Sequence, residues 1–148
     1  EGRYAAAIQR LGLGDRVTIR PPIPYEQVPQ AVLAHDVALA YVPELPADWM
    51  YHPTLKVLEY RALGLPIIAT DFRPNREVID DGENGLLITN TPESIAAAMR
   101  RYVCEPDFLA HSRAAAEARR EGLTWDIVAA RYLALYERLH SSTGRLVA

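Results

Sequence analysis

Apolar and polar positions alternate up to about residue 91 in a way that predicts helices and strands in turn. Helices are expected where apolar residues recur every three or four positions, and buried strands where short apolar runs stand between turn residues. The expected helices span residues 4–11, 26–34, 53–63 and 74–79, and the expected strands span residues 17–20, 37–42, 66–70 and 86–88. This alternation is typical of a Rossmann-like α/β fold, a parallel sheet with helices on both faces joined by right-handed crossovers.

The pattern changes after Pro92, where the helical repeat continues without further strands. Residues 94–105, 107–121 and 124–142 are all expected to be helical. We therefore expect one domain over residues 1–148, with an α/β portion over about 1–91 and a helical cover over about 92–142. Four strands are few for a doubly wound domain and the chain opens on a helix, so we expect at least one further strand upstream of Glu1.

Composition and charge narrow the class of protein. The 148 residues are 49% hydrophobic and 24% charged, which fits a globular domain. The formal net charge of -3 and the pI near 5.8 argue against a general basic surface for nucleic acid or an anionic membrane. No apolar run approaches the roughly 20 residues of a membrane span, and no signal peptide opens the chain. We expect a soluble protein.

The single cysteine, Cys104, excludes an internal disulfide and suits a reducing compartment. It lies in the apolar run "YVC" near an expected helix end, and no histidine is close in sequence to activate it. We interpret it as a buried thiol rather than as a nucleophile.

The first candidate site follows the expected strand 37–42, because ligands of open parallel sheets lie beyond the carboxyl ends of the strands. A loop leads from there into a helix expected to begin at Pro53, since proline suits the first helical position. His52 would then lie near the N-cap, as a cap or as a phosphate contact, and the amides of Thr54, Leu55 and Lys56 would point out of the helix end. Such an end binds anions.

Lys56, the only lysine of the chain, is three residues before Glu59, so the two share a helix face. Leu55, Leu58 and Ala62 are expected to form the stripe that faces the sheet. Glu59 should lie roughly 8 to 10 Å along the axis from the helix start, which suits a nucleoside diphosphate with its phosphates at that end. The alternative is an ordinary surface Lys–Glu pair.

The second candidate site follows the expected strand 66–70 and should face the same crevice. Its polar residues are Asp71, Arg73, Asn75, Arg76 and Glu77. An alternative remains open in which Asn75 or Asp71 only caps the short helix, and Arg76 and Glu77 are solvated.

At these loops the sequence resembles the C-terminal, nucleotide-sugar-binding domain of the family 4 retaining glycosyltransferases, which have the two-domain GT-B fold. The resemblance is carried by four segments in family order, and together they cover nearly the whole chain. They are "LGLGDRVTIRPPIPYEQVPQAVLAHDVALAYVP", "HPTLKVLEYRALGLPIIATD", "NREVIDDGENGLLI" and "LTWDIVAARYLALYERL".

The resemblance implies roles for particular residues of a donor pocket. Glu59 matches the second glutamate of the family's Glu-x7-Glu pattern, which holds the donor ribose hydroxyls, and Tyr51 stands where the first often is. The backbone at Thr54 and Leu55 would meet the diphosphate, and Lys56 would supply charge to it. The remaining implied donor-binding residues are Pro22 and Ile23 near the base, and Asn75, Arg76 and Glu77 at the sugar end.

Two further features follow from the resemblance. Arg73 and Pro74 replace a glycine pair common in the family. The Trp125 segment resembles the last helix, which in the family crosses back toward the N-terminal domain.

The implied activity is transfer of a sugar from a nucleotide diphosphate sugar to a glycan or lipid-linked acceptor, with retention of the anomeric configuration. We expect the nucleotide sugar as substrate, no cofactor and no metal, because His35, His52, His111 and His140 lack metal-ligand spacing. The family's basic pair and its acceptor domain would precede Glu1, so the isolated chain is expected to be inactive.

Other functions stay open. A non-catalytic nucleotide-sugar-binding module fits the loss of the glutamate at Tyr51, and a GT-B epimerase or phosphorylase fits the same fold. A dinucleotide dehydrogenase is disfavoured, because no G-x-G-x-x-G opens a helix. The family's commonest setting implies polysaccharide biosynthesis in the cytoplasm, compatible with peripheral contact at the inner membrane face. No nucleic-acid partner is expected.

Overall fold

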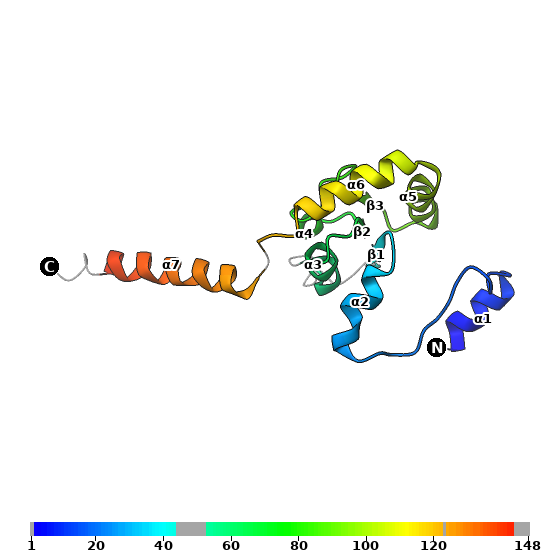
Figure 1. The fold of residues 1–148 in the computed structure, drawn as a ribbon, viewed down its shortest axis with the longest axis horizontal. Coiled ribbons are helices and arrows are strands. Elements are labelled where there is room, and N and C mark those ends of the chain that lie inside the picture. The colour runs from blue at the N-terminus through cyan, green and yellow to red at the C-terminus, as the bar shows by residue number, and fades with distance from the viewer. Residues whose placement is uncertain (1, 44–52, 123, 144–148) are drawn as a thin grey trace. The chain divides into compact units, whose positions relative to one another are not determined.

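The computed structural model describes residues 2–43, 53–122 and 124–143 (Figure 1). The chain divides into two compact units, Glu1–Gln30 and Ala31–Ala148.

The first unit begins with helix α1, Gly2–Arg10, which confirms the helix predicted over residues 4–11. Gly12 ends it with a φ of 64°, a left-handed conformation that suits glycine, and Leu13 N donates to the Ile8 carbonyl at 2.9 Å. The helix predicted over residues 26–34 is present in two parts, the 3-10 turn η1, Tyr25–Gln27, and α2, Val28–Leu33.

The strand predicted over residues 17–20 is wrong. No ladder joins this segment to any other part of the described chain, and Val17 and Ile19 are each 43% exposed. Alternating apolar residues favour an extended backbone, but a strand also needs a neighbour that takes its N–H and C=O groups.

The second unit contains a parallel sheet in the order β1-β2-β3. The strands are β1, Ala38–Ala40, β2, Ile67–Thr70, and β3, Gly85–Ile88, and they confirm the other three predicted strands. Ala38 pairs with Ile67, and Ile67 pairs with Gly85 on its other side. Every residue of the central strand β2 is buried, as expected for a parallel strand covered on both faces.

Helices cover both faces of this sheet. On one face, Val57 from α3, Leu55–Ala62, and Ile79, which follows α4, Arg73–Arg76, pack with Ile67. On the other face, Ala98 and Tyr102 from α5, Pro92–Cys104, pack with Ile68 of the same strand. The predicted α/β architecture is therefore confirmed.

Three helices follow Pro92 as predicted, α5, α6, Pro106–Ala118, and α7, Trp125–Thr143. Helices α5 and α6 cover the sheet, whereas the described side chains of α7 are almost all exposed, so its predicted part in the cover is not confirmed. Within α5 and α6 the buried Tyr102 and Ser112 hydroxyls share a hydrogen bond of 3.0 Å. Burial raises the pKa of Tyr102, an effect that the Ser112 hydrogen bond partly offsets. Cys104, at the end of α5, is exposed, so the interpretation of a buried thiol is wrong. It lies on the outer side of an amphipathic helix.

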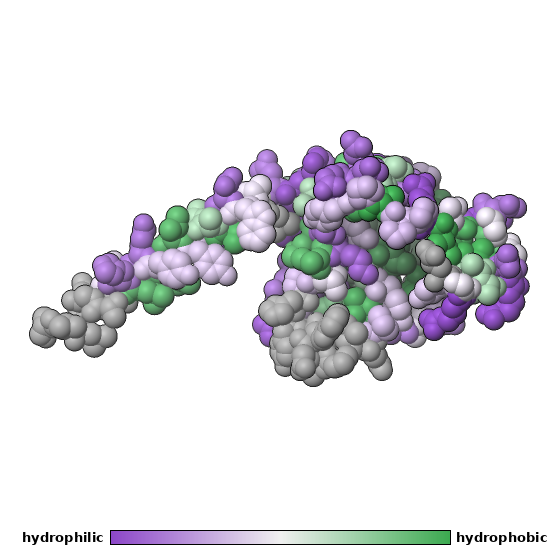
Figure 2. All heavy atoms as spheres, turned by 90° about the horizontal axis from the view of Figure 1, so that it is seen from below, coloured by the Kyte–Doolittle hydropathy of each residue, from purple (hydrophilic) through white to green (hydrophobic). Residues whose placement is uncertain are grey.

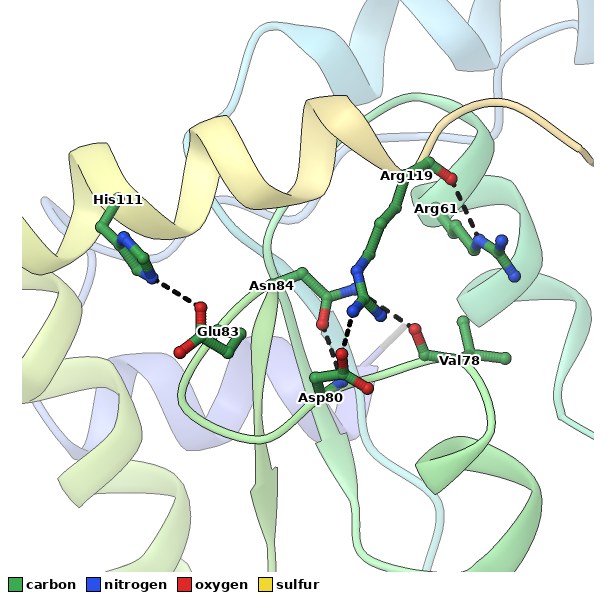
Figure 3. Close-up of polar contacts among 7 residues, drawn as sticks. All are labelled: Arg61, Val78, Asp80, Glu83, Asn84, His111 and Arg119. Carbon is green, nitrogen blue, oxygen red and sulfur yellow. Dashed lines mark hydrogen bonds and ion pairs between the residues drawn. The ribbon is translucent and has the colours of Figure 1, made fainter.

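Polar contacts tie α6 to the loop before β3 and to α3 (Figure 3). His111 Nε2 lies 2.8 Å from a Glu83 oxygen, and Arg119, directly after α6, forms an ion pair with Asp80. Arg61 of α3 donates from Nε to the Arg119 carbonyl at 3.2 Å. The end of α6 is thus bonded to α3, which precedes the central strand β2 in the sequence, and to the loop before β3, which follows it.

The segment "DGENG" forms a turn before β3, and Asn84 organises it from within (Figure 3). Asn84 is 2% exposed, accepts from Asp80 N at 2.7 Å and donates to the Val78 carbonyl at 3.2 Å. Gly82 has a φ of 83°, which a residue with a side chain rarely adopts.

Helix α7 carries apolar side chains that are exposed, visible as green and pale residues along the helix in Figure 2. They include Trp125, Tyr132, Leu133 and Tyr136. Crossing of this helix to another domain stays a prediction. Within the described ranges, the structure contains no helix with the length and apolar character of a membrane span.

Candidate functional site

The carboxyl ends of β1 and β2 are joined by the Thr70 side chain. Its Oγ1 accepts from Val42 N at 2.9 Å and donates to the Val42 carbonyl at 3.0 Å. Thr70 is 7% exposed. A hydroxyl at the last position of an otherwise apolar buried strand is the sequence signal that marks this residue.

Asn75 is fully buried beside this junction. Its Nδ2 donates to the Thr70 carbonyl at 2.8 Å, while its Oδ1 has no hydrogen-bond partner within residues 2–43, 53–122 and 124–143. The N-cap of α4 is Phe72, with no side-chain cap, so the alternative that Asn75 or Asp71 caps this helix is wrong. The Asn75 side chain bonds back to the strand, and Asp71 bonds elsewhere.

Asp71 and Arg76 form a two-point ion pair at the surface of the same turn. Arg76 Nε lies 2.6 Å and Nη2 3.0 Å from the two carboxylate oxygens. The hydrogen bond from Arg76 lowers the pKa of Asp71, partial burial opposes this change, and the Arg76 charge adds to it. Glu77 lies 3.7 Å from Arg73 in a pair whose side chains are 67% and 90% exposed. The solvated alternative therefore describes Glu77 well.

The Asp71–Arg76 pair predicts a pH dependence of stability. Because the folded-state pKa of Asp71 is below that of the unfolded chain, the pair stabilises the fold above about pH 3.9, and this contribution disappears as the pH falls through the lower folded-state value. Asp71→Asn is expected to lower the free energy of unfolding slightly at pH 7, since the pair is partly exposed, and by less in strong acid. Urea unfolding at both pH values measures the difference.

Arg76→Gln is the companion variant, because it removes the same pair from the other side. It should match Asp71→Asn at pH 7. A loss in Asp71→Asn that is the same at both pH values would contradict the role given to the carboxylate.

Helix α3 begins at Leu55, two residues later than predicted. Thr54 is the N-cap, with an extended backbone and no side-chain cap bond, and Val57 N donates to its carbonyl at 3.0 Å. Pro53 therefore precedes the cap instead of taking the first helical position, and the first helical amides are those of Leu55 and Lys56. These groups have no carbonyl one turn back to bond, so they remain suited to an anion.

The apolar stripe predicted for α3 is confirmed at Leu58, which packs against the core, and is wrong at Leu55 and Ala62. Leu55 is 75% exposed and Ala62 is exposed, whereas Val57 is fully buried, with Leu58 and Tyr60 packed beside it. A short helix with apolar residues on several sides can pack against a sheet through any of those sides. In this fold, the side that carries Val57 packs against the sheet. Burial raises the pKa of Tyr60, and the neighbouring Glu59 charge raises it further.

With Val57 facing the sheet, Lys56 is exposed and Glu59 is half-buried on the other side of α3. Both residues are described, and the structure places no ion pair between them, so the alternative of an ordinary surface pair is not realised there. The two side chains are left able to meet a ligand.

For four other predicted donor-binding residues, a place at this edge stays a prediction. Tyr51 and His52 lie outside the described residues. Pro22 and Ile23 are exposed and belong to the first unit, so their place in a pocket stays a prediction. An apolar cavity of about 470 Å³ lies near the start of β1, lined among others by Leu39 and Met99, and it is not at the predicted site.

The search for a metal site covered residues 2–43, 53–122 and 124–143. No three His, Cys, Asp or Glu side chains gather there in a way that would hold an ion. The expectation of metal-independent chemistry stays a prediction.

Comparison with known families decides the class of protein. Residues 1–105 match the family described as "Glycosyl transferases group 1". The chain belongs to this family. The prediction of a glycosyltransferase is thereby confirmed.

Relatives of this group 1 glycosyltransferase chain include two actinobacterial proteins named D-inositol 3-phosphate glycosyltransferase. The one from Streptomyces scabiei is 30% identical over 128 residues, 86% of this chain and 27% of the relative. The one from Thermomonospora curvata is 31% identical over 127 residues, 85% of this chain and 28% of the relative. The chain thus spans little more than a quarter of their length.

Two solved structures share the fold. Sucrose-phosphate synthase from Thermosynechococcus elongatus superposes with a TM-score of 0.74 at 26% identity, over 95% of this chain and 34% of that one. Anabaena HepE, solved in complex with UDP-glucose, gives a TM-score of 0.71 at 22% identity, over 95% of this chain and 36% of that one. These likenesses confirm the predicted GT-B-type α/β fold.

Proposed function

We propose that the chain is the donor-binding half of a retaining glycosyltransferase, which moves a sugar from a nucleotide diphosphate sugar to a glycan or lipid-linked acceptor. The observation that carries the proposal is the arrangement of α3. Its free N-terminal amides are followed by Lys56 and Glu59 on the side turned away from the sheet, after a parallel strand. Membership of the glycosyltransferase family supports it.

The chemistry of this helix end suits a nucleoside diphosphate. The diphosphate would meet the amides of Leu55 and Lys56 and the Lys56 charge, because helix N-termini favour anions. Glu59 lies five residues after the cap, about 7 to 8 Å along the axis, where its carboxylate would accept hydrogen bonds from the ribose hydroxyls. Stabilisation of the departing diphosphate by amides and a lysine needs no metal or cofactor.

The rest of the enzyme is part of the proposal. The chain spans about a third of the structures that it resembles, so an acceptor-binding domain elsewhere in the intact protein would complete the site. Alone, the chain would be inactive. Structures of Anabaena HepE with UDP and with UDP-glucose support a nucleotide sugar as the donor class. We place the enzyme in the cytoplasm, in polysaccharide or glycolipid assembly at the inner membrane face.

Titration of UDP-, GDP- and ADP-sugars against the intact protein tests the proposal. One nucleotide should bind, and Glu59→Ala should raise its Kd by roughly 10-fold to 100-fold, since hydrogen bonds to a charged group are worth about 1.5–3 kcal/mol. Lys56→Ala should raise the Kd by about 10-fold for loss of a phosphate contact. Calorimetry measures both.

Glu93→Ala is the control, because Glu93 is an exposed carboxylate on α5. It should bind like the parent. Failure of every nucleotide to bind, or parent-like binding by both α3 variants, would overturn the assignment.

A second candidate is a nucleotide-sugar-binding module without transfer, favoured by Tyr51 at the position of a family glutamate. Binding of the nucleotide sugar without product, by the intact protein and a range of acceptors, would support it. Product analysis would also reveal a GT-B epimerase or phosphorylase.

A further inference from the structure

We propose that Thr70 and Asn75 are positioning residues of the donor site. Their side chains end the hydrogen-bonded ladder between β1 and β2 one step early. This early end sets the spacing between the ends of the two strands, from which the donor loops begin. The inference rests on the proposed function, because it concerns the same edge of the sheet.

The register of the two strands shows where the ladder is interrupted. Ala38 N donates to the Pro66 carbonyl at 2.9 Å, and parallel ladders repeat every second residue. Two repeats further along both strands, the same ladder would have Val42 N donate to the Thr70 carbonyl. It donates instead to the Thr70 hydroxyl, and the strands pair only as far as Ala40 and Ala69.

Asn75 occupies the carbonyl that the ladder leaves unused. Its Nδ2 donates to the Thr70 carbonyl at 2.8 Å, at the oxygen that the next backbone bond from Val42 would use. The Thr70 hydroxyl meanwhile serves both polar groups of Val42. Two side chains thus replace the next step of the ladder.

On its other side the strand continues without interruption. Thr70 pairs with Ile88, and Asp71 N donates to the Ile88 carbonyl at 2.7 Å. The early end is therefore specific to the β1 side, from which the chain proceeds toward α3 with Lys56 and Glu59. The segment after β2 leads to Asn75 itself.

The interruption carries a stability cost that a purely structural role does not explain. Among the residues that the structure describes, buried Asn75 Oδ1 has no hydrogen-bond partner, and an unpaired buried acceptor is destabilising. An unbroken ladder with an apolar residue at position 75 would leave no such group. A requirement for the separate ends of β1 and β2 accounts for the retention of asparagine.

Thr70→Val and Thr70→Ser in the intact protein test the inference, with the Kd of the bound nucleotide and the melting temperature measured for each. Thr70→Val keeps the shape and loses the hydroxyl, so its Kd should rise by about 5-fold to 10-fold, the fold-change that corresponds to one net hydrogen bond. Thr70→Ser keeps the hydroxyl, so its Kd should equal that of the parent. If Thr70→Val does not fold, Asn75→Ala takes its place, since it frees the Thr70 carbonyl.

Ser112→Ala is the matched control, because it also removes a buried hydroxyl bond, to Tyr102 in the helical cover. It should lower the melting temperature and leave the Kd unchanged. A Kd that is unchanged in Thr70→Val, or raised equally by Ser112→Ala, would overturn the inference while the proposed function stands. If the parent binds no nucleotide, the proposed function fails first and the inference with it.

Discussion

Gly85→Ala is expected to lower the free energy of unfolding by about 3 kcal/mol, at the upper end of the range for overpacked cores. A Cβ at this position would lie 2.4 Å from the Ile67 carbonyl oxygen and 2.9 Å from Ile79 Cγ2. The oxygen belongs to the backbone of the central strand, which is paired on both sides and cannot move without disturbing both ladders. Urea unfolding followed by circular dichroism measures the loss.

Gly14→Ala is the control for this substitution. A Cβ at Gly14 would meet no heavy atom within 4 Å, and its φ is not positive. It should change the unfolding free energy little. Similar urea midpoints for the two variants would show that the close approach of Gly85 to β2 is not a constraint on the fold.

Asn75→Asp is expected to cost about 3 kcal/mol at pH 7, because it places a carboxylate without a cationic partner at a fully buried position beside the Thr70 carbonyl. The amide donor is lost, and two oxygens with negative charge approach each other. Burial should raise the folded-state pKa of the introduced carboxyl above its unfolded value of about 3.9.

The pH dependence of this variant has a defined sign. Below about pH 3.9 the carboxyl is protonated in both states, and its O–H is able to donate to the Thr70 carbonyl as Nδ2 does. The deficit relative to the parent should therefore be smallest in acid and grow as the pH rises toward the raised folded-state pKa. Parallel urea titrations of parent and variant at several pH values measure it.

Gln30→Glu adds the same charge at an exposed position and serves as the control. Its stability should stay close to that of the parent. A deficit in Asn75→Asp that does not vary with pH would contradict burial of the carboxylate as the cause.

Much of the fold was predictable from local patterns. Three of four predicted strands, including the central strand Ile67–Thr70, and the three helices that follow Pro92 are present where apolar periodicity placed them. The family was also predictable from short sequence motifs, above all from the stretch around Lys56 and Glu59. Periodicity and short motifs depend on residues close in sequence, so they are accessible without coordinates.

The details of the site were less predictable. The stripe of α3 was expected at Leu55, Leu58 and Ala62, whereas Val57 is the buried residue and only Leu58 of the three packs beside it. The first helical amide was expected after Pro53, but Thr54 takes the cap. Both features depend on how the helix meets the sheet, and several arrangements of so short a helix differ little in local energy.

Local spacing thus determined the order and type of most elements, the glycosyltransferase family and the candidate residues of α3. Tertiary structure decided which of these segments and side chains have hydrogen-bonding partners. Residues 17–20 have the pattern of a strand but no ladder in the described chain, and Thr70 and Asn75 exchange the hydrogen bonds of the next ladder step. The physical reason is that a backbone hydrogen bond needs a second segment at the right distance, and no pattern within one segment specifies where that second segment lies.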